Sequence, residues 1–263
     1  LLLESFGNAQ TLLNKNSSRF GKWQELHFSS SGRISGCTVR HYLLELARVS
    51  KPTEGERNFH GFHQLLAGAS ADERAALRLG LATAADFRYT AGGARLAADE
   101  DDARQWRSLQ AALESVSVDL PRRDALSRLL AGILHLGNVD FAERSTPGPL
   151  LLRDASAASL AADLLGFDLD ELTEALTTRT VLAGGEPVVL HHSVEQAIDA
   201  RDALSRTVYS AVFEGLVDHL NERLHPGRPA LLQLQPSTTG RTKGRAQLPA
   251  AAMRQQQAAM PNA

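Results

Sequence analysis

The chain has 263 residues, of which 43% are hydrophobic and 22% are charged, so it is long enough to bury a core in one large domain or two small ones. Its net charge of −2 is unevenly distributed, because residues 226–263 carry five basic residues and no acidic one, which leaves −7 on residues 1–225. An acidic body argues against binding nucleic acid through a general basic surface.

Cysteine content and apolar runs exclude further classes. The single cysteine, Cys37, permits no intrachain disulfide and favours a reducing compartment. No apolar run approaches the roughly 20 residues that span a bilayer, so membrane insertion is not expected. The start of the chain lacks the charged and apolar regions of a signal peptide.

The first predicted elements are a helix end and a β-hairpin. Residues 1–9 are typical of the last part of a helix, broken at Gly7-Asn8. Residues 22–28 alternate as a strand does, the following Ser-Ser-Ser-Gly favours a turn, and residues 33–39 predict a second strand. The two strands therefore predict a hairpin.

After the hairpin, apolar residues recur at helical spacing. Gly137 and Gly166 are predicted to close two helices, and Asp168 with Glu171 has the spacing of a capping box for a third. Residues 194–224 predict a long amphipathic helix. The apolar positions that define the helical faces are Phe59, Phe62, Leu65 and Leu66, then Leu126, Leu129, Leu130, Ile133 and Leu134, then Leu160, Leu164 and Leu165, and in the long helix Ile198, Leu204, Val208, Val212, Leu216 and Leu220. We interpret each face as core.

Polar segments between the helices are interpreted as surface. Residues 80–93 and 142–150 are predicted loops. The acidic run 99–102 precedes a helix and is interpreted as a solvated first turn, which the helix dipole favours. His60 and His63 lie three residues apart without a third ligand at a characteristic spacing, so they are interpreted as packed or surface histidines.

Residues 180–183 and 187–190 flank the sequence Gly184-Gly185-Glu186 and predict a second hairpin. Beyond the long helix, the tail combines Pro, Gly, Gln and Ala with few large apolar residues and is predicted to be disordered.

The run Asn-Lys-Asn-Ser-Ser-Arg-Phe-Gly-Lys at residues 14–22 carries the residue types that hold a nucleotide γ-phosphate and its Mg²⁺. A serine hydroxyl can replace one water on Mg²⁺, and an adjacent serine can position a water or contact a phosphate oxygen. An arginine beside them can anchor the loop to a carboxylate through two hydrogen bonds. The alternative for the run alone is an exposed polar turn.

The segments around this run match a known family. Residues 3–11 precede it, and together the two segments closely resemble switch I of the myosin motor and the helix before it. Kinesins share an Asn-x-x-Ser-Ser-Arg element but usually continue Ser-His, whereas Phe-Gly-Lys follows here as in myosins. The other segments that resemble myosin signatures, in family order, are residues 42–49, 56–66, 130–139 and 200–213. Departures such as Leu13 and Lys15 suggest a divergent unconventional myosin.

The resemblance implies a mainly helical fold with a few β-strands. It corresponds to part of the P-loop NTPase fold of a myosin head, with a helical upper actin-binding subdomain and a β-hairpin of the central sheet. Residues 1–225 form the partial motor domain. Residues 226–263 are a low-complexity tail unlike the family.

The resemblance also implies roles in an actin-activated ATPase that uses ATP and Mg²⁺. Asn14, Ser17 and Ser18 contact the nucleotide, and Ser18 ligates the Mg²⁺. Ser17 helps to place the attacking water, and Arg19 pairs with a glutamate of switch II. The implied location is the cytoplasmic actin cytoskeleton.

In myosins, the loop at the place of the second predicted hairpin, residues 180–190, contacts actin. Arg179, Gly184, Gly185 and Glu186 are therefore candidate residues for filamentous actin. Myosins often have an acidic or phosphorylatable residue sixteen positions before an Asp-Ala-Leu element, and counting back from Asp202 reaches Glu186. A permanent carboxylate there would replace phosphorylation. The alternative is an ordinary exposed glutamate.

Two other myosin elements have no counterpart. The chain contains neither a Gly-rich loop ending Gly-Lys-Thr or Gly-Lys-Ser nor the Asp-x-x-Gly-Phe-Glu element of switch II. It begins without Met, which suggests a piece of a longer product. Because the Gly-rich loop and switch II are missing, we expect that the chain alone does not turn over ATP and that Arg19 lacks its carboxylate partner on switch II. Light chains are not expected to bind. The alternatives are a truncated non-enzymatic binding or regulatory fragment, and a gene-model fragment without independent function.

Overall fold

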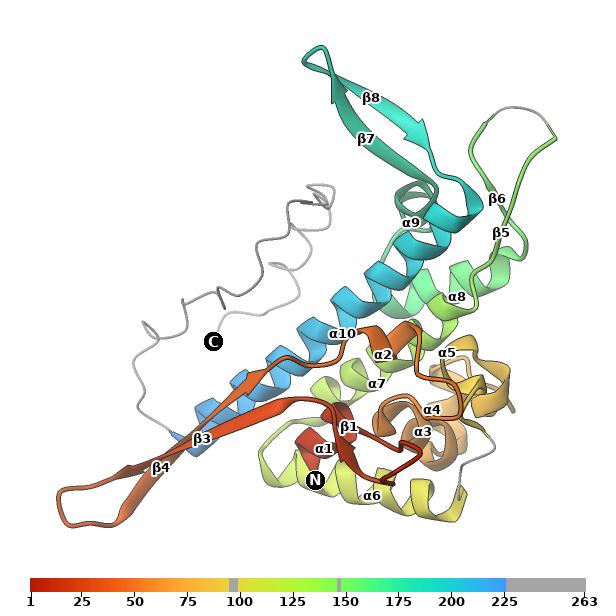
Figure 1. Ribbon diagram of the computed structural model, residues 1–263. Coiled ribbons are helices and arrows are strands. Elements are labelled where there is room, and N and C mark those ends of the chain that lie inside the picture. The colour runs from red at the N-terminus through yellow and green to blue at the C-terminus, as the bar shows by residue number, and fades with distance from the viewer. Residues whose placement is uncertain (95–98, 146–147, 226–263) are drawn as a thin grey trace. The chain divides into compact units, whose positions relative to one another are not determined.

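Helices predominate in the computed structural model, which describes residues 1–94, 99–145 and 148–225 (Figure 1). The helices are α1 (Leu2–Gly7), α2 (Ala47–Ser50), α3 (His60–Gly68), α4 (Ala71–Ala76), α5 (Arg88–Ala91), α6 (Asp99–Ser115), α7 (Leu120–Gly137), α8 (Ala155–Leu165), α9 (Leu169–Thr177) and α10 (Val194–Leu224), with the 3-10 helix η1 (Ala84–Asp86). The mainly helical fold with a few strands is therefore confirmed.

Strands in the described residues pair into four separate two-stranded antiparallel sheets. These are β1 (Asn8–Ala9) with β2 (Ser17–Ser18), β3 (Gly21–Phe28) with β4 (Ile34–Tyr42), β5 (Phe141–Ala142) with β6 (Leu151–Leu152), and β7 (Thr178–Ala183) with β8 (Glu186–His191). Both predicted hairpins are present, and β4 continues past its predicted end at Val39.

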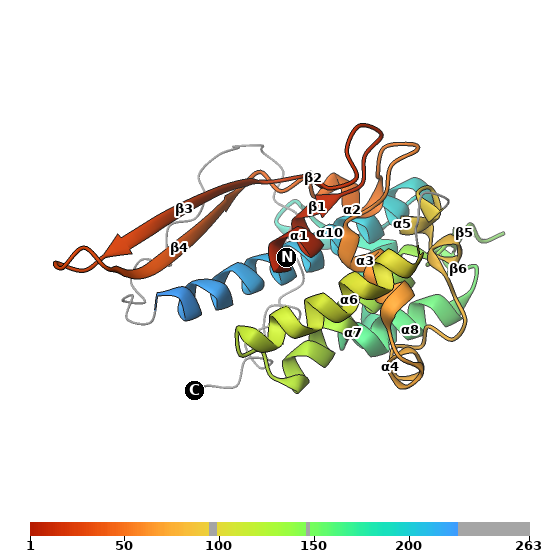
Figure 2. The ribbon, with the colours of Figure 1, turned by 90° about the horizontal axis from the view of Figure 1, so that it is seen from below.

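The β3–β4 hairpin lies along the C-terminal half of α10 (Figure 2). The amide of Asn221 on α10 joins them, since it accepts from Val39 N at 2.7 Å and donates to Val39 O at 2.9 Å. Val39 is buried in this contact, whereas Trp23 and Leu26 on β3 remain 58% and 55% exposed. The hairpin is therefore anchored through β4.

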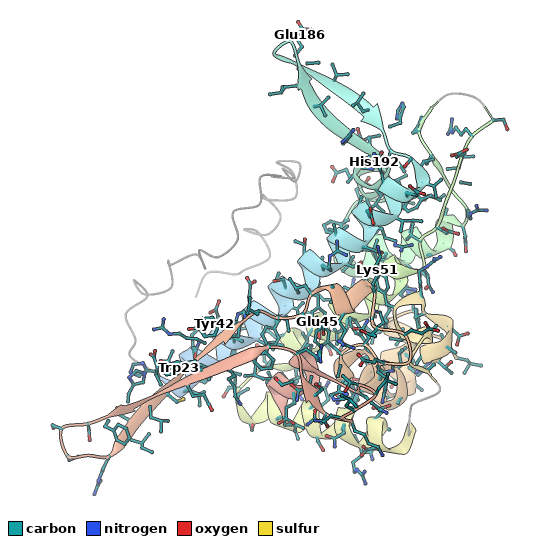
Figure 3. All side chains as sticks on the ribbon, viewed as in Figure 1. Trp23, Tyr42, Glu45, Lys51, Glu186 and His192 are labelled. Carbon is teal, nitrogen blue, oxygen red and sulfur yellow. The ribbon has the colours of Figure 1, made fainter. Side chains whose placement is uncertain are left out.

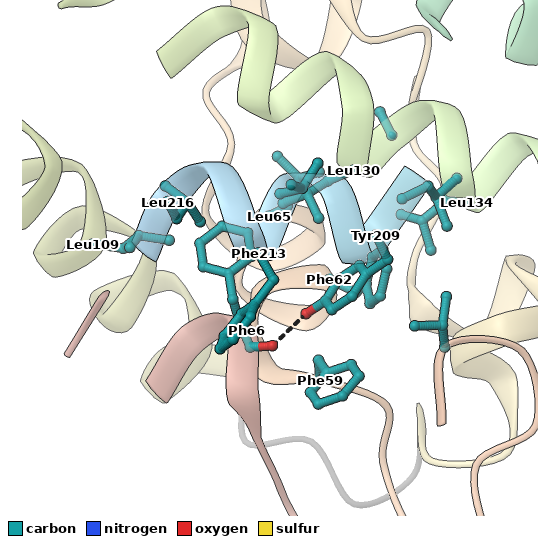
Figure 4. Packing of buried hydrophobic residues seen from close by; sticks show 14 of the residues in the cluster. Phe6, Phe59, Phe62, Leu65, Leu109, Leu130, Leu134, Tyr209, Phe213 and Leu216 are labelled. Carbon is teal, nitrogen blue, oxygen red and sulfur yellow. Dashed lines mark hydrogen bonds between the residues drawn. The ribbon is translucent and has the colours of Figure 1, made fainter. Parts of the chain in front are cut away.

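The main core gathers α1, α3, α6, α7 and α10 around aromatic rings (Figure 4). The Tyr209 ring stacks on Phe59 at 4.9 Å and lies 5.3 Å from Phe62. Its hydroxyl donates to the Phe6 carbonyl oxygen at 2.8 Å, so the one polar atom of this ring is satisfied. The stripe over α3 predicted from the sequence is buried here.

A smaller core lies where α7 ends and packs against α8, α9 and the start of α10. Ala197 of α10 belongs to this smaller core, and Tyr209 of the same helix belongs to the main one. The predicted bounds of α10 are correct, and its first turn is closed by a reciprocal capping box between Ser193 and Gln196. One long helix therefore connects both cores.

A buried ion pair fixes α10 to its neighbours. The Arg201 guanidinium donates to the Asp202 carboxylate at 2.7 Å and to the Val139 carbonyl oxygen at 2.8 Å. The Tyr89 hydroxyl also donates to Asp202, at 2.8 Å. Both charged side chains are 2% exposed, so the Arg201 guanidinium depends on Asp202 for its counter-charge, whereas Asp202 also lies 3.9 Å from the Lys51 ammonium.

Two sequence-based interpretations need correction. Residues 80–93 are not a plain loop, because a capping box between Thr83 and Asp86 starts η1, and α5 follows with Tyr89 buried. The predicted helix ends at Gly137 and Gly166 are confirmed, and of these two glycines Gly166 has a left-handed backbone, at φ 74°, whereas Gly137 does not. Gly137 instead packs against the Tyr89 ring, where a Cβ would lie 2.7 Å from ring carbons.

The second interpretation to correct is that of the acidic run 99–102, which forms the start of α6. Asp102 in this run is not solvated, since it is 7% exposed and accepts a hydrogen bond of 2.6 Å from the Arg57 guanidinium. The predicted disordered tail, 226–263, lies outside the described residues. Among the residues that are described, no helix is long and apolar enough to cross a membrane.

Candidate functional site

The run at residues 14–19 forms one arm of a short hairpin. β1 follows α1 directly and pairs with β2, so that Asn8 lies opposite Ser18 and Ala9 opposite Ser17. The connecting loop is closed by Thr11, whose backbone N–H donates to Asn14 O at 2.8 Å. Arg19 follows β2 directly, and its backbone N–H donates to Gly7 O at 2.8 Å. The candidate residues are therefore held against the end of α1.

The candidate side chains have local partners. Asn14 Oδ1 accepts from the backbone N–H of Asn16 at 2.9 Å. The Ser18 hydroxyl is exposed and donates to Phe20 O at 2.9 Å. The Ser17 hydroxyl accepts from Arg19 Nη1 at 3.3 Å. Asn14, Ser17 and Ser18 are therefore arranged within one short polar segment, with oxygen ligands of the kind that Mg²⁺ prefers.

Within the described residues Arg19 pairs with a carboxylate that the sequence did not indicate, Glu45, and its pairing with a switch II glutamate stays a prediction. Arg19 Nε donates to Glu45 Oε2 at 2.6 Å, and Arg48 Nε donates to the same oxygen at 2.7 Å. Burial alone would raise the pKa of Glu45, but the hydrogen bonds from the two arginines hold this pKa below its ordinary value. The pKa of Arg19 is raised in turn by its hydrogen bond to Glu45.

Arg48 extends this network into the protein. Its side chain is 1% exposed, and it donates to Glu56 Oε2 at 2.8 Å and to Arg57 O at 3.0 Å. Neither Glu45 nor Arg48 has a role predicted from the sequence, although both lie in the segment 42–49 that resembles the family. Their spacing from Arg19 carried no signal for the ion pair.

The second candidate surface is the β7–β8 hairpin, where Ala183 pairs with Glu186 across a two-residue turn. Gly184 and Gly185 occupy the turn at φ 62° and 91°, backbone conformations that favour glycine. Figure 3 shows Glu186 at the hairpin tip, well away from Glu45. Arg179 pairs with Leu190 near the base, so the structure does not bring it to the tip.

A family model described as the myosin head (motor domain) matches residues 1–231 of the chain. The chain belongs to this family. It is 39% identical to myosin-1 of Arabidopsis thaliana over 228 residues, which cover 86% of this chain and 19% of that protein. It is 40% identical to unconventional myosin-VI of Mus musculus over an alignment of 256 positions, which covers 84% of this chain and 20% of that protein.

A third myosin relative is unconventional myosin-Va of Gallus gallus, 40% identical over 225 residues that cover 85% of this chain and 12% of that protein. The chain thus spans about a fifth or less of the length of these three myosins. Family membership is confirmed by these matches. The roles of Asn14, Ser17, Ser18, Arg19 and the hairpin residues stay predictions.

In this myosin head segment, α10 also contacts the end of the candidate switch. Phe20 follows Arg19 directly, and its ring packs edge-on against Phe213 of α10 at 5.2 Å. The N-terminal end of α10 begins just after β8 (Figure 1).

Among the described residues, no group of three or more His, Cys, Asp or Glu side chains is arranged to hold a metal ion.

Proposed function

We propose that this chain is part of an actin-based motor that couples ATP hydrolysis to force, and that residues 14–22 are its nucleotide switch. The observation that carries the proposal is the arrangement of the run. Ser17 and Ser18 lie together on one short strand, and the arginine that follows them is anchored to Glu45. A segment held at its ends, with polar side chains between, is suited to closing over a phosphate.

Each residue of the switch has a separate role in this proposal. The Ser18 hydroxyl would hold Mg²⁺, and the Asn14 amide would contact the phosphates. The Ser17 hydroxyl would orient the attacking water, and it is itself held by a hydrogen bond from Arg19 Nη1. Arg19 latches the closed loop to a carboxylate of switch II. Bound Mg²⁺ supplies charge neutralisation on the phosphate oxygens.

We further propose that the β3–β4 hairpin belongs to the central sheet of a P-loop NTPase fold. The exposure of Trp23 and Leu26 supports this, since apolar side chains on a strand ordinarily pack against a neighbouring element.

The partner in this proposal is filamentous actin, reached through the tip of the β7–β8 hairpin in the cytoplasm. Glu186 would present a negative charge there, and Leu182 beside it is 77% exposed. An exposed apolar residue beside a charge supplies the two parts that protein interfaces combine, an apolar centre and a polar rim.

Glu186→Lys should weaken the response to actin. The variant is made in a chimeric myosin head in which residues 1–225 replace the corresponding segment. Reversing one charge at an interface rim acts mainly on the rate at which the two proteins associate. We therefore expect the ratio of actin-activated to basal phosphate release to fall roughly fivefold. The measurement is a phosphate-release assay with and without filamentous actin.

Glu222→Lys is the matched control, because this exposed residue lies near the opposite end of α10 and undergoes the same charge change. It should leave the ratio unchanged. Equal effects of both variants would contradict the actin role of Glu186.

The 263-residue chain alone should release no phosphate, and actin-stimulated release from it as a homogeneous monomer would contradict its role as part of a larger site.

A further inference from the structure

The amide of Asn16 receives two hydrogen bonds from outside the loop that contains it. Asn16 Oδ1 accepts from Asn8 Nδ2 at 3.0 Å and lies 3.1 Å from His60 Nε2. Asn16 directly precedes Ser17 in the candidate switch, and His60 is the first residue of α3. One amide oxygen therefore joins the switch to α3 across 44 residues of sequence.

The start of α3 is a firm support for this contact. Phe59 forms a β-bridge with Ala9, and the backbone N–H of Arg57 donates to Gln10 O at 2.9 Å. Gly61 lies so close to Ser5 that a Cβ would be 3.1 Å from its carbonyl oxygen. Residues 57–61 are therefore packed against residues 5–10, the segment that leads into the switch.

The chemistry of the His60 ring agrees with a donor role. Burial, followed by the nearby positive charge of Arg57, lowers the pKa of His60 to about 4. The ring is neutral at physiological pH and carries one N–H. Since the Asn16 oxygen also accepts from Asn8, it is an acceptor, and the proton of His60 belongs on Nε2.

We propose that His60 and Asn8 are positioning residues that hold Ser17 and Ser18 in place through the amide of Asn16. Neither residue has a part in the roles assigned above to Asn14, Ser17, Ser18 and Arg19. We call the two hydrogen bonds to the Asn16 amide oxygen the Asn16 clamp. The mechanistic meaning of this clamp rests on the proposed nucleotide switch. Its physical content does not, because it concerns only how firmly residues 14–19 are held.

The first test measures amide hydrogen exchange at residues 14–19 in the 263-residue chain. His60→Leu removes the donor while keeping a side chain of similar size. Loss of its hydrogen bond to Asn16 should let residues 14–19 open more often. We expect exchange at Ser17 and Arg19 to become roughly tenfold faster. His60→Gln retains an N–H donor and should restore most of the protection. His191→Leu, on exposed β8, is the control and should change nothing at these amides.

A second variant keeps the test decisive if His60→Leu disturbs packing of α3. Asn16→Ala removes the shared acceptor without altering α3, and should reproduce the faster exchange. Combining it with His60→Leu should add little, because both changes break the same contact. Unchanged exchange in Asn16→Ala, or fully additive effects in the double variant, would overturn the clamp.

A measurement in the chimeric head separates this inference from the proposed function. If the clamp positions a nucleotide switch, His60→Leu should raise KM for ATP more than it lowers kcat, and His60→Gln should reverse the change. Faster exchange combined with unaltered ATP turnover would uphold the clamp and contradict the nucleotide role of residues 14–22.

Discussion

Arg19→Ala should leave ATP binding to the chimeric myosin head largely intact and slow hydrolysis by roughly a hundredfold, because the arginine aligns the closed site rather than cradling the phosphates. The Ala side chain removes the bond to Glu45, the contact with the Ser17 hydroxyl and the proposed latch to switch II. Nucleotide binding and a single-turnover burst of phosphate, measured separately, distinguish the two steps.

Arg19→Lys and Arg33→Ala are the comparisons for this variant. Lysine retains the charge but not the guanidinium geometry, so hydrolysis should fall to an intermediate rate. Arg33 lies exposed in the turn between β3 and β4, and its loss should have no effect. Hydrolysis by Arg19→Ala at the parental rate would show that the anchor is not needed.

Asp202→Ala should reduce the free energy of unfolding by about 3–5 kcal/mol, because it leaves the Arg201 guanidinium buried without its counter-charge. The Tyr89 hydroxyl would also lose one acceptor. The measurement is the urea midpoint of the 263-residue chain.

Asp199→Ala is the matched control on the same helix. Its side chain is 73% exposed and pairs with Lys51 at 3.4 Å, a surface contact, so the expected change is within about 0.5 kcal/mol. Equal midpoints for the two variants would contradict the structural role of the Arg201–Asp202 pair.

Helices and hairpins were predictable where the signal is local. The bounds of α10 follow from apolar spacing, and the second hairpin follows from Gly184-Gly185, which fit a tight turn. The helix α5 was missed because a four-residue helix carries no periodicity. Its burial depends on Tyr89 contacting residues more than a hundred positions away.

The candidate site was predictable only in part. Ser17, Ser18 and Arg19 are consecutive, so their chemistry is visible in the sequence alone. Their supports are not, since Glu45 lies 26 residues from Arg19 and His60 lies 44 residues from Asn16. Such pairs form when folding brings α3 and the segment after β4 against the switch. Periodicity and spacing carry no information about them.

The most direct test of the central claim is metal rescue at Ser18 in the chimeric head. Ser18→Cys replaces a hard oxygen ligand by a soft sulfur, so ATP hydrolysis with Mg²⁺ should fall by roughly tenfold or more. Replacing Mg²⁺ with Cd²⁺ should restore part of the rate in this variant alone, and not in the control Ser30→Cys, which lies in the exposed turn of the β3–β4 hairpin. Parental hydrolysis by Ser18→Cys with Mg²⁺, or equal effects of Cd²⁺ on both variants, would contradict Ser18 as the metal ligand of a nucleotide switch.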